Sequence, residues 1–328
     1  MNQFTIFMFS GQGSHYYQMG RELFEQNPVF RKNVLDGDRI VSEMTGVSII
    51  SQIYSNVYKK SDQFSHTLYT HPAIFLVEYA LAQVVMEIGI NPDYVLGASL
   101  GGFAAAAIAG VIPFETALTA VVRQAEALET LCPQGGMMAV IHSPDLFFEN
   151  PLFHEHLELA AVNFPSHFVV SGDRKSLSDI QILLEEKKII FQMLDVSRGF
   201  HSSLIDPAAA AYKNFLNTLV LDDPNICFIS CSHANVLPFL PRDYFWETVR
   251  APIYFQKTIQ VLEEQAPYLY LDLGPSGTLA SFVKYNLSEK STSRSLPLLN
   301  PFGQDLKNLS RLKDTLPLLS DGEGEQLR

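Results

Sequence analysis

The chain has 328 residues, of which 47% are hydrophobic, 11% aromatic and 18% charged. This apolar content excludes an intrinsically disordered chain, and the length suffices for one large domain or two moderate ones. The 35 acidic and 23 basic residues give a formal charge of −12 without a dense basic stretch. That balance argues against a nucleic-acid binder, because such proteins neutralise phosphates with Lys and Arg.

The cysteines and the N-terminus bear on the cellular location. Cys132, Cys227 and Cys231 form no CxxC pair and no even-numbered framework, which indicates a reducing, cytoplasmic setting and predicts no structural metal site. The N-terminal residues show no charged region followed by a cleavage site. Because the longest uninterrupted apolar stretches fall far short of the roughly 20 residues that span a bilayer, we expect no membrane partner.

The first part of the chain alternates apolar runs with helical patterns. The run at residues 4–9 predicts a buried strand that enters a tight Gly-rich loop. Thr70 and Pro72 suit an N-cap and a first-turn position, so a helix is expected to open there. In chain order the patterns predict a strand at 4–9, helices at 19–34 and 70–88, a strand at 93–96, and helices at 99–110 and 114–131.

The pattern changes after residue 131. Several strands and one helix of moderate length lie between two helix-rich parts, which favours an inserted α+β subdomain of about 65 residues. The predicted strands lie at 136–141, 157–162, 167–172 and 189–196, with a helix at 177–188. Beyond them come a helix at 207–219, a strand at 226–230, a helix at 254–264 and a strand at 268–273. From residue 288 the chain turns polar, and 321–325 are typical of a frayed tail.

The segment Gly97-Ala98-Ser99-Leu100-Gly101 matches the pattern G-x-S-x-G, which is weak evidence by itself. Here it follows a predicted strand and precedes a predicted helix, the context that a nucleophile elbow requires. The glycines permit a sharp turn that pushes the Ser99 hydroxyl out of the sheet, and the Leu100 N–H would face a developing oxyanion. We interpret Ser99 as a nucleophile; the alternative is a Gly-rich turn without chemistry.

A serine hydroxyl needs a base to become a good nucleophile. Of the nine histidines, His201 lies in a loop between a predicted strand and a predicted helix, where catalytic side chains often project. On position alone, a loop histidine is more often a surface residue.

Several short motifs occur in an order that is typical of one enzyme family. They are Phe9-Ser10-Gly11-Gln12-Gly13-Ser14, Gly97–Gly101, Ala109-Gly110-Val111-Ile112, Val162-Asn163, Val169-Val170-Ser171-Gly172, Phe200-His201-Ser202 and Leu273-Gly274-Pro275. Over about residues 4–300 the chain resembles the malonyl-CoA:acyl carrier protein transacylases and the acyltransferase domains of polyketide synthases. Within that family it looks most like the discrete, trans-acting acyl hydrolases of trans-acyltransferase polyketide synthases.

The resemblance implies a fold and a catalytic pair. The fold would be a hydrolase-like α/β core with a parallel sheet, formed by residues 1–131 and 199–300, with a ferredoxin-like α+β subdomain at 132–198. Residues 301–328 would be a C-terminal extension that is partly disordered. Ser99 would be the nucleophile and His201 its base, and the backbone N–H groups of Gln12 and Leu100 would form the oxyanion hole.

One departure from the family bears on the substrate. Malonyl-transferring members carry an arginine 25 positions after the nucleophile, and that position here is Gln124. A neutral amide cannot replace the bidentate guanidinium. Leaving a malonyl carboxylate buried without its cation costs on the order of 3–5 kcal/mol, so neutral acyl groups are expected instead. The alternatives are that Gln124 is merely a helix former, or that Arg198 supplies the missing cation.

Other acyl-binding and orienting residues follow from the same resemblance. Ala98 and His71 replace a family His and Gln. Ala98 would open space beside the nucleophile, or the change is neutral; His71 is either part of the site or only a residue at a helix N-terminus. Asn163 and Phe200 would line the pocket. A backbone carbonyl just ahead of the segment Ala251-Pro252-Ile253-Tyr254-Phe255 would orient His201, and we expect it from about Thr248, so that no acidic triad member is needed.

The sequence therefore predicts a serine enzyme that hydrolyses acyl thioesters of acyl carrier proteins in polyketide, and hence antibiotic, biosynthesis. The substrate would arrive on the phosphopantetheine arm, with no cofactor. Two alternatives stay open: an acyltransferase that loads malonyl or another acyl unit from CoA, and a catalytically silent docking subunit. Carrier proteins are typically acidic, so a local basic patch would have to offset the overall charge; its candidates are Arg31, Lys32, Arg174, Lys175 and Arg198.

Overall fold

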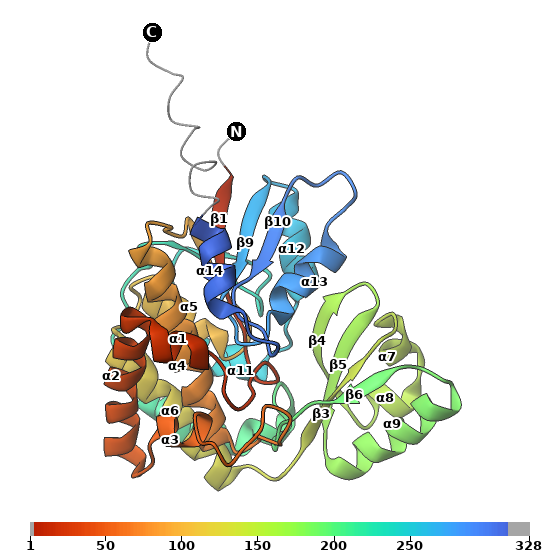
Figure 1. Ribbon diagram of the computed structural model, residues 1–328. Coiled ribbons are helices and arrows are strands. Elements are labelled where there is room, and N and C mark those ends of the chain that lie inside the picture. Colours follow the sequence, from red (N-terminus) through yellow and green to blue (C-terminus); the bar gives the residue numbers. More distant parts are fainter. Residues whose placement is uncertain (1–2, 314–328) are drawn as a thin grey trace.

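The computed structural model of the protein describes residues 3–313. Within that range the strands are β1 (Phe4–Phe9), β2 (Tyr94–Gly97), β3 (Gly136–Val140), β4 (Glu158–Phe164), β5 (His167–Gly172), β6 (Phe191–Met193), β7 (Cys227–Ser230), β8 (Asn235–Leu237), β9 (Tyr268–Asp272) and β10 (Arg294–Pro297). They form two separate sheets, which Figure 1 shows in different parts of the molecule. The predicted α/β fold class is confirmed.

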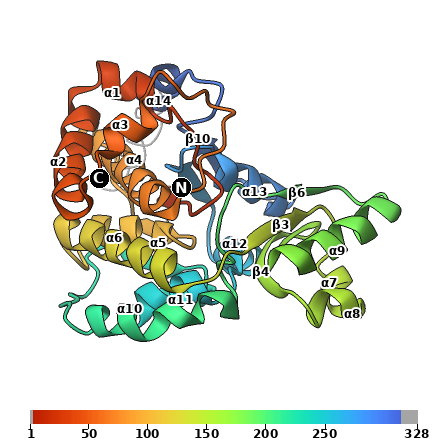
Figure 2. The ribbon, with the colours of Figure 1, turned by 90° about the horizontal axis from the view of Figure 1, so that it is seen from below.

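Helices cover both faces of the larger sheet (Figure 1, Figure 2). The helices of the first half are α1 (Arg21–Gln26), α2 (Pro28–Thr45), α3 (Ile49–Ile53), α4 (Thr67–Glu87), α5 (Gly101–Ile108), α6 (Phe114–Leu131), α7 (Asp145–Glu149) and α8 (Pro151–His154). The second half adds α9 (Arg174–Glu186), the 3-10 helix η1 (Ser203–Ala208), α10 (Ala209–Leu216), α11 (Tyr244–Arg250), α12 (Phe255–Glu263), α13 (Thr278–Asn286) and α14 (Asp305–Lys313).

The larger sheet has the strand order β10-β9-β1-β2-β7-β8, and every pair except β7–β8 is parallel. Side chains alternate between the two faces of a strand. Phe7 and Phe9 of β1 therefore join the core formed with α4, α5 and α6, whereas Ile6 and Met8 join the core formed with α12 and α13. Burial on both faces explains why β1 is a continuous apolar run.

The smaller sheet is antiparallel, with the order β4-β5-β3-β6. Its helices α7, α8 and α9 lie between its strands in sequence, which gives the βαββαβ order of a ferredoxin-like unit. It has a hydrophobic core of its own, which includes Phe153, Phe168 and Leu177. All of its strands come from the predicted insertion 132–198, whose limits stay a prediction, and Figure 2 shows it projecting to one side of the larger sheet.

Several helices begin at places that differ from the predicted ones, including α9 at Arg174 and η1 at Ser203, and two of them show why. The predicted helix 19–34 is two helices, because the Asn27 side chain accepts from Phe30 N and caps a new start at Pro28. Helix α4 begins before Thr70, because the Glu129 carboxylate accepts a hydrogen bond from Thr67 N at 2.8 Å. Pro72 therefore lies inside α4, not in its first turn.

The polar C-terminal part is more ordered than expected over the described residues. Strand β10 extends the larger sheet beside β9, and α14 forms within the predicted extension 301–328, with Leu309 buried. The frayed tail predicted at 321–325 lies outside the described residues.

Helix α4 is an apolar segment longer than the uninterrupted apolar stretches of the sequence led us to expect. It is long and apolar enough to cross a membrane by length and composition, with a mean hydropathy of 1.2. However, 78% of that window is buried inside the fold, as in a core helix of a globular domain.

Gly101 generates a prediction about the turn between β2 and α5. A Cβ at this position would lie 2.1 Å from the Phe9 carbonyl oxygen, so Gly101→Ala must displace either β1 or the turn. We expect a loss of about 1–3 kcal/mol in the free energy of unfolding from overpacking, measured by denaturant titration, together with a loss of any activity that depends on Ser99.

Gly46→Ala is the matched control. Gly46 has a φ of 75° but nothing within 4 Å of the added Cβ, so only the left-handed backbone costs stability, by about 1–2 kcal/mol. Activity should be retained. An active, fully stable Gly101→Ala protein would contradict this packing.

Candidate active site

Ser99 lies in the turn between the end of β2 and the start of α5, at the carboxyl edge of the parallel sheet. Its φ is 56°, a left-handed conformation that is costly for a non-glycine residue and marks functional turns. The turn is tight because Gly97 and Gly102 pack directly on each other: a Cβ on Gly97 would lie 2.5 Å from Gly102 Cα. The Thr248 hydroxyl donates to the Ser99 carbonyl at 3.0 Å and supports the turn from α11.

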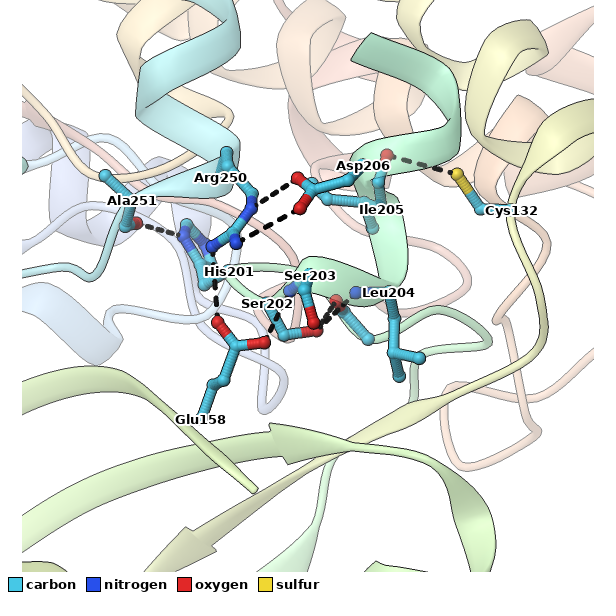
Figure 3. Close-up of polar contacts among 11 residues, drawn as sticks. Cys132, Glu158, His201, Ser202, Ser203, Leu204, Ile205, Asp206, Arg250 and Ala251 are labelled. Carbon is cyan, nitrogen blue, oxygen red and sulfur yellow. Dashed lines mark hydrogen bonds and ion pairs between the residues drawn. The ribbon is translucent and has the colours of Figure 1, made fainter. Parts of the chain in front are cut away.

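His201 is brought to Ser99 from a loop 102 positions away. Its Nε2 lies 2.8 Å from Ser99 Oγ, and its Nδ1 lies 2.7 Å from the carbonyl oxygen of Ala251 (Figure 3). A carbonyl only accepts, so Nδ1 carries the proton and Nε2 is free to accept from Ser99. The orienting carbonyl was expected from about Thr248 or a neighbour, and it belongs to Ala251, three residues later. Thr248 lies inside α11, whereas Ala251 follows that helix in an extended conformation.

Burial sets the protonation state of His201. Desolvation lowers the pKa of its imidazole to about 4, the Ala251 carbonyl opposes that shift, and the charge of Arg250 adds to it. The imidazole is therefore neutral at pH 7 and able to take the hydroxyl proton of Ser99.

An ion-pair cluster lies beside the catalytic loop (Figure 3). Arg250 donates to Asp206 at 2.6 Å and to Glu158 at 3.3 Å. Glu158 also accepts from Ser203 N, two residues after His201. The cluster joins β4 of the smaller sheet to the His201 loop, and the sequence analysis did not find it, since its members are far apart in the chain and show no motif.

The loop after β1 lies against Ser99. A Cβ on Gly11 would be 2.7 Å from Ser99 Cβ, and the Gln12 side chain is held by a hydrogen bond of 2.8 Å from Nε2 to Thr70 Oγ1. Within residues 3–313 the backbone N–H groups of Gln12 and Leu100 have no acceptor. Two free N–H groups beside a nucleophile are what an oxyanion hole requires.

A cavity of about 360 Å³ opens at Ser99. Ala98, Asn163 and Phe200 are part of its wall, as expected, whereas the Leu100 side chain is buried in the core. The smaller sheet contributes apolar side chains (Met137, Ala139, Ala161 and Val169) and polar ones (Asn163, His167 and Gln192), and α13 contributes Thr278, Leu279 and Phe282. The other lining residues are Ser10, Gly11, Gln12, Gly13, Ser14, Leu194, Ile253, Phe255 and Ser276, together with Ser99 and His201.

The structure does not place Gln124 or Arg198 in this wall. Gln124 is 0% exposed, and its Nε2 donates to the Phe245 carbonyl at 3.0 Å, which turns the amide towards α11. Arg198 is buried and forms an ion pair with Glu129 at 2.5 Å, so its charge is already neutralised. Arg198 therefore supplies no cation to the cavity, and an effect of Gln124 on selectivity stays a prediction.

His71 lies behind the wall instead of in it. Its ring centroid is 5.5 Å from that of Phe200, and both of its nitrogens lack a hydrogen-bond partner among the described residues. Desolvation lowers the pKa of His71 to about 3, so it is a neutral, buried imidazole that contacts the site through Phe200.

The family is decided by comparison with known sequences. Residues 6–318 match the model of the acyl transferase domain. The chain belongs to the acyl transferase domain family. It is 44% identical to the polyketide biosynthesis acyltransferase homolog PksD of Bacillus subtilis, over 95% of this chain and 97% of that protein.

Solved structures agree with this assignment. The acyltransferase domain from the second module of the salinomycin polyketide synthase superposes with a TM-score of 0.85 at 27% identity, covering 100% of this chain and 79% of that one. The MCAT of Streptococcus pneumoniae gives a TM-score of 0.78 at 26% identity, covering 95% of this chain and 100% of that one.

One cavity residue of this member of the acyl transferase domain family, His167, was not predicted from the sequence. His167 begins β5, its Nδ1 lies 3.1 Å from the Asn163 amide nitrogen, and its ring contacts Phe282. Desolvation lowers its pKa to about 4, so it adds a neutral polar group to the cavity. A histidine at the start of a strand carries no signal that could have singled it out.

The protonation state of His201 generates a pH prediction. Because the base must be neutral and its pKa is about 4, kcat/KM should hold from neutral pH down to about pH 5 and fall as the pH passes about 4. Stopped assays with a neutral acyl thioester between pH 3.5 and 8 measure this acid limb. A midpoint near the ordinary histidine value of 6.5 would contradict the burial argument.

Arg250→Met should raise that midpoint, because it removes a positive charge near His201 and leaves the Asp206 and Glu158 carboxylates unpaired. The matched control is Arg123→Met, which breaks an exposed ion pair with Glu126 on α6. The control should leave the midpoint where it is.

Proposed function

We propose that the protein is an acyl hydrolase that removes acyl groups from the acyl carrier proteins of a polyketide synthase. The observation that carries the proposal is the Ser99–His201 hydrogen bond of 2.8 Å at a cavity whose described lining contains no Lys or Arg. The likeness to the acyltransferase homolog PksD supports a role in polyketide biosynthesis.

The first half-reaction would acylate Ser99. His201 Nε2 takes the Ser99 hydroxyl proton while Oγ attacks the thioester carbonyl carbon, and the Gln12 and Leu100 N–H groups stabilise the oxyanion. The carbon–sulfur bond then breaks, and the pantetheine thiol leaves with the proton from His201. Ser99 is left as an ester.

The second half-reaction would release the acid. Water gives a proton to His201 and attacks the Ser99 ester; the bond between the acyl carbon and Oγ breaks, and the proton returns to Ser99. Acyl groups that are stalled or wrongly loaded would leave the carrier protein as free acids. Every group needed comes from this chain and from the phosphopantetheine arm of the substrate, so the proposal includes no cofactor.

Selectivity would follow from the charge of the cavity wall. A malonyl carboxylate would be desolvated there without a cation, at a cost on the order of 3–5 kcal/mol. Since about 1.4 kcal/mol is a factor of ten, malonyl should be disfavoured by at least about a hundredfold relative to acetyl or butyryl. The apolar side chains of the smaller sheet favour neutral, aliphatic acyl groups.

The carrier protein is the proposed partner, in a cytoplasmic setting. Among the basic residues considered for docking, Arg198 is buried and cannot contact a carrier protein. Lys32 already forms an ion pair with Asp36 at 2.8 Å. Arg174 and Lys175 stay exposed at the start of α9, on the smaller subdomain that supplies one wall of the cavity.

A transferase that loads an acyl unit is the second candidate, and membership of the acyl transferase domain family favours it. Its first half-reaction is identical, and a second thiol replaces water in the other half. A silent docking subunit has no such support, because Ser99 and His201 are both present and in contact.

To test the proposal, the purified protein is incubated with acetyl-, butyryl- or malonyl-carrier protein, with and without a second, empty carrier protein. The acyl groups on both carrier proteins are then followed by mass. We expect free acid from acetyl and butyryl carriers, little reaction with malonyl, and no loading of the second carrier.

Ser99→Ala is the control and should leave every carrier loaded. Rapid malonyl transfer to the second carrier with negligible hydrolysis would refute the hydrolase proposal and favour the transferase.

A further inference from the structure

A buried carboxyl group that the mechanism does not use lies behind the oxyanion loop. Glu78 projects from α4 and is 0% exposed. Its Oε1 accepts hydrogen bonds from Ser10 N at 2.6 Å and from Ser10 Oγ at 2.7 Å. Its Oε2 has no partner within the described part of the chain. Burying a carboxyl group is costly, so this group is not explained by packing alone.

Ser10 is the residue at which β1 passes into the loop that holds Gln12. The Ser10 hydroxyl lies 2.9 Å from Ser14 Oγ, which in turn donates to the Gly11 carbonyl at 2.7 Å. The Ser10 hydroxyl has one proton, shared between Glu78 and Ser14, and these contacts hold both ends of the loop while Gly11 rests against Ser99. The position of the Gln12 N–H relative to Ser99 therefore depends on where Ser10 is held.

Helix α4 holds the loop at two points. Thr70 accepts from the Gln12 side chain and Glu78 accepts from Ser10. The two residues are eight positions apart, which places them on similar faces of the helix about 12 Å apart along its axis. One rigid helix thus sets both the start of the loop and its middle.

A second buried acid supports the same residue from the opposite side. Asp272 accepts from Gly274 N at 2.9 Å and from Ala280 N at 2.8 Å. A Cβ on Gly274 would lie 2.4 Å from Ser10 Oγ, so this loop packs directly on Ser10. Burial raises the pKa of Glu78 well above its usual range, the hydrogen bonds from Ser10 oppose that shift, and the charge of Asp272 adds to it. Its Oε1 can accept from Ser10 N whether the carboxyl group is charged or neutral.

We propose that Glu78 is a positioning residue that fixes the oxyanion loop, so that the Gln12 N–H faces the transition state formed on Ser99. It touches neither substrate nor reacting atoms, and acts through Ser10. The inference rests on the proposed acyl-enzyme at Ser99. It concerns only the acylation step, which hydrolysis and transfer share.

The test measures acylation of Ser99 by butyryl-carrier protein in single turnovers, with the acyl-enzyme followed by intact mass. Glu78→Leu removes the acceptor, and we expect the maximal acylation rate to fall at least about tenfold, compared with about 10²–10³ for the loss of a whole oxyanion donor. The carrier concentration at half-maximal rate should stay the same. Glu78→Gln keeps a carbonyl acceptor and should stay within about twofold of the wild type.

A matched control separates positioning from simple stability. Val85→Ala removes buried methyl groups from the same helix without contact to the loop, and should lower Tm while leaving the acylation rate unchanged. If Glu78→Leu does not fold, Glu78→Asp shortens the side chain and should lower the rate in the same way.

Three results would overturn the inference: an unchanged acylation rate in the variant without the acceptor, a change confined to the half-saturating concentration, or an equal loss in Glu78→Gln. A wild-type protein whose Ser99 takes up no acyl group would instead refute the proposed function, and with it the step on which Glu78 acts.

Discussion

The hydrogen bond between Ser99 Oγ and His201 Nε2 is the interaction on which the rest of the site depends. It joins a turn at the edge of the parallel sheet to a loop that lies between the two sheets. The backbones of Ser99 and His201 both take a left-handed conformation, and adjacent glycines and the Thr248 hydroxyl support that of Ser99. The parallel sheet provides the frame, because the turns after β1 and β2 meet at the same edge.

Burial away from water keeps the imidazole of His201 neutral, so that it can accept a proton from Ser99. The same burial that makes the imidazole of His201 neutral also makes His167 and His71 neutral. Arg198 is already paired with Glu129. The described lining of the cavity therefore presents hydrogen-bonding groups and apolar side chains but no Lys or Arg, and the proposed preference for uncharged acyl thioesters rests on this.

Much of the fold could be predicted from sequence where the pattern is local and strong. The strand Phe4–Phe9, the strand His167–Gly172 and the helix Phe114–Leu131 have their predicted bounds. Predicted helix bounds were less accurate where a residue distant in sequence determines where a helix begins. Glu129, for example, accepts a hydrogen bond from the backbone at the start of α4. Helices α11 and α13 and strand β10 were missed, because they are short and depend on packing against the sheet.

In the site, too, features within a local motif could be predicted, whereas contacts between distant segments could not. Ser99 sits in a local motif, and the resemblance to a family placed His201 beside it. The orientation of Gln124 towards Phe245, the carbonyl of Ala251, and the contact between Glu78 and Ser10 all depend on side chains or backbone brought together from distant segments. No spacing in the sequence encodes them.

Rapid-quench analysis of one turnover with butyryl-carrier protein tests the central claim most directly. A covalent intermediate predicts a burst of free carrier thiol equal to the enzyme present, butyric acid that appears after a lag, and a peptide containing Ser99 that is heavier by one butyryl group. Simultaneous release of thiol and acid, with Ser99 unmodified throughout, would contradict it.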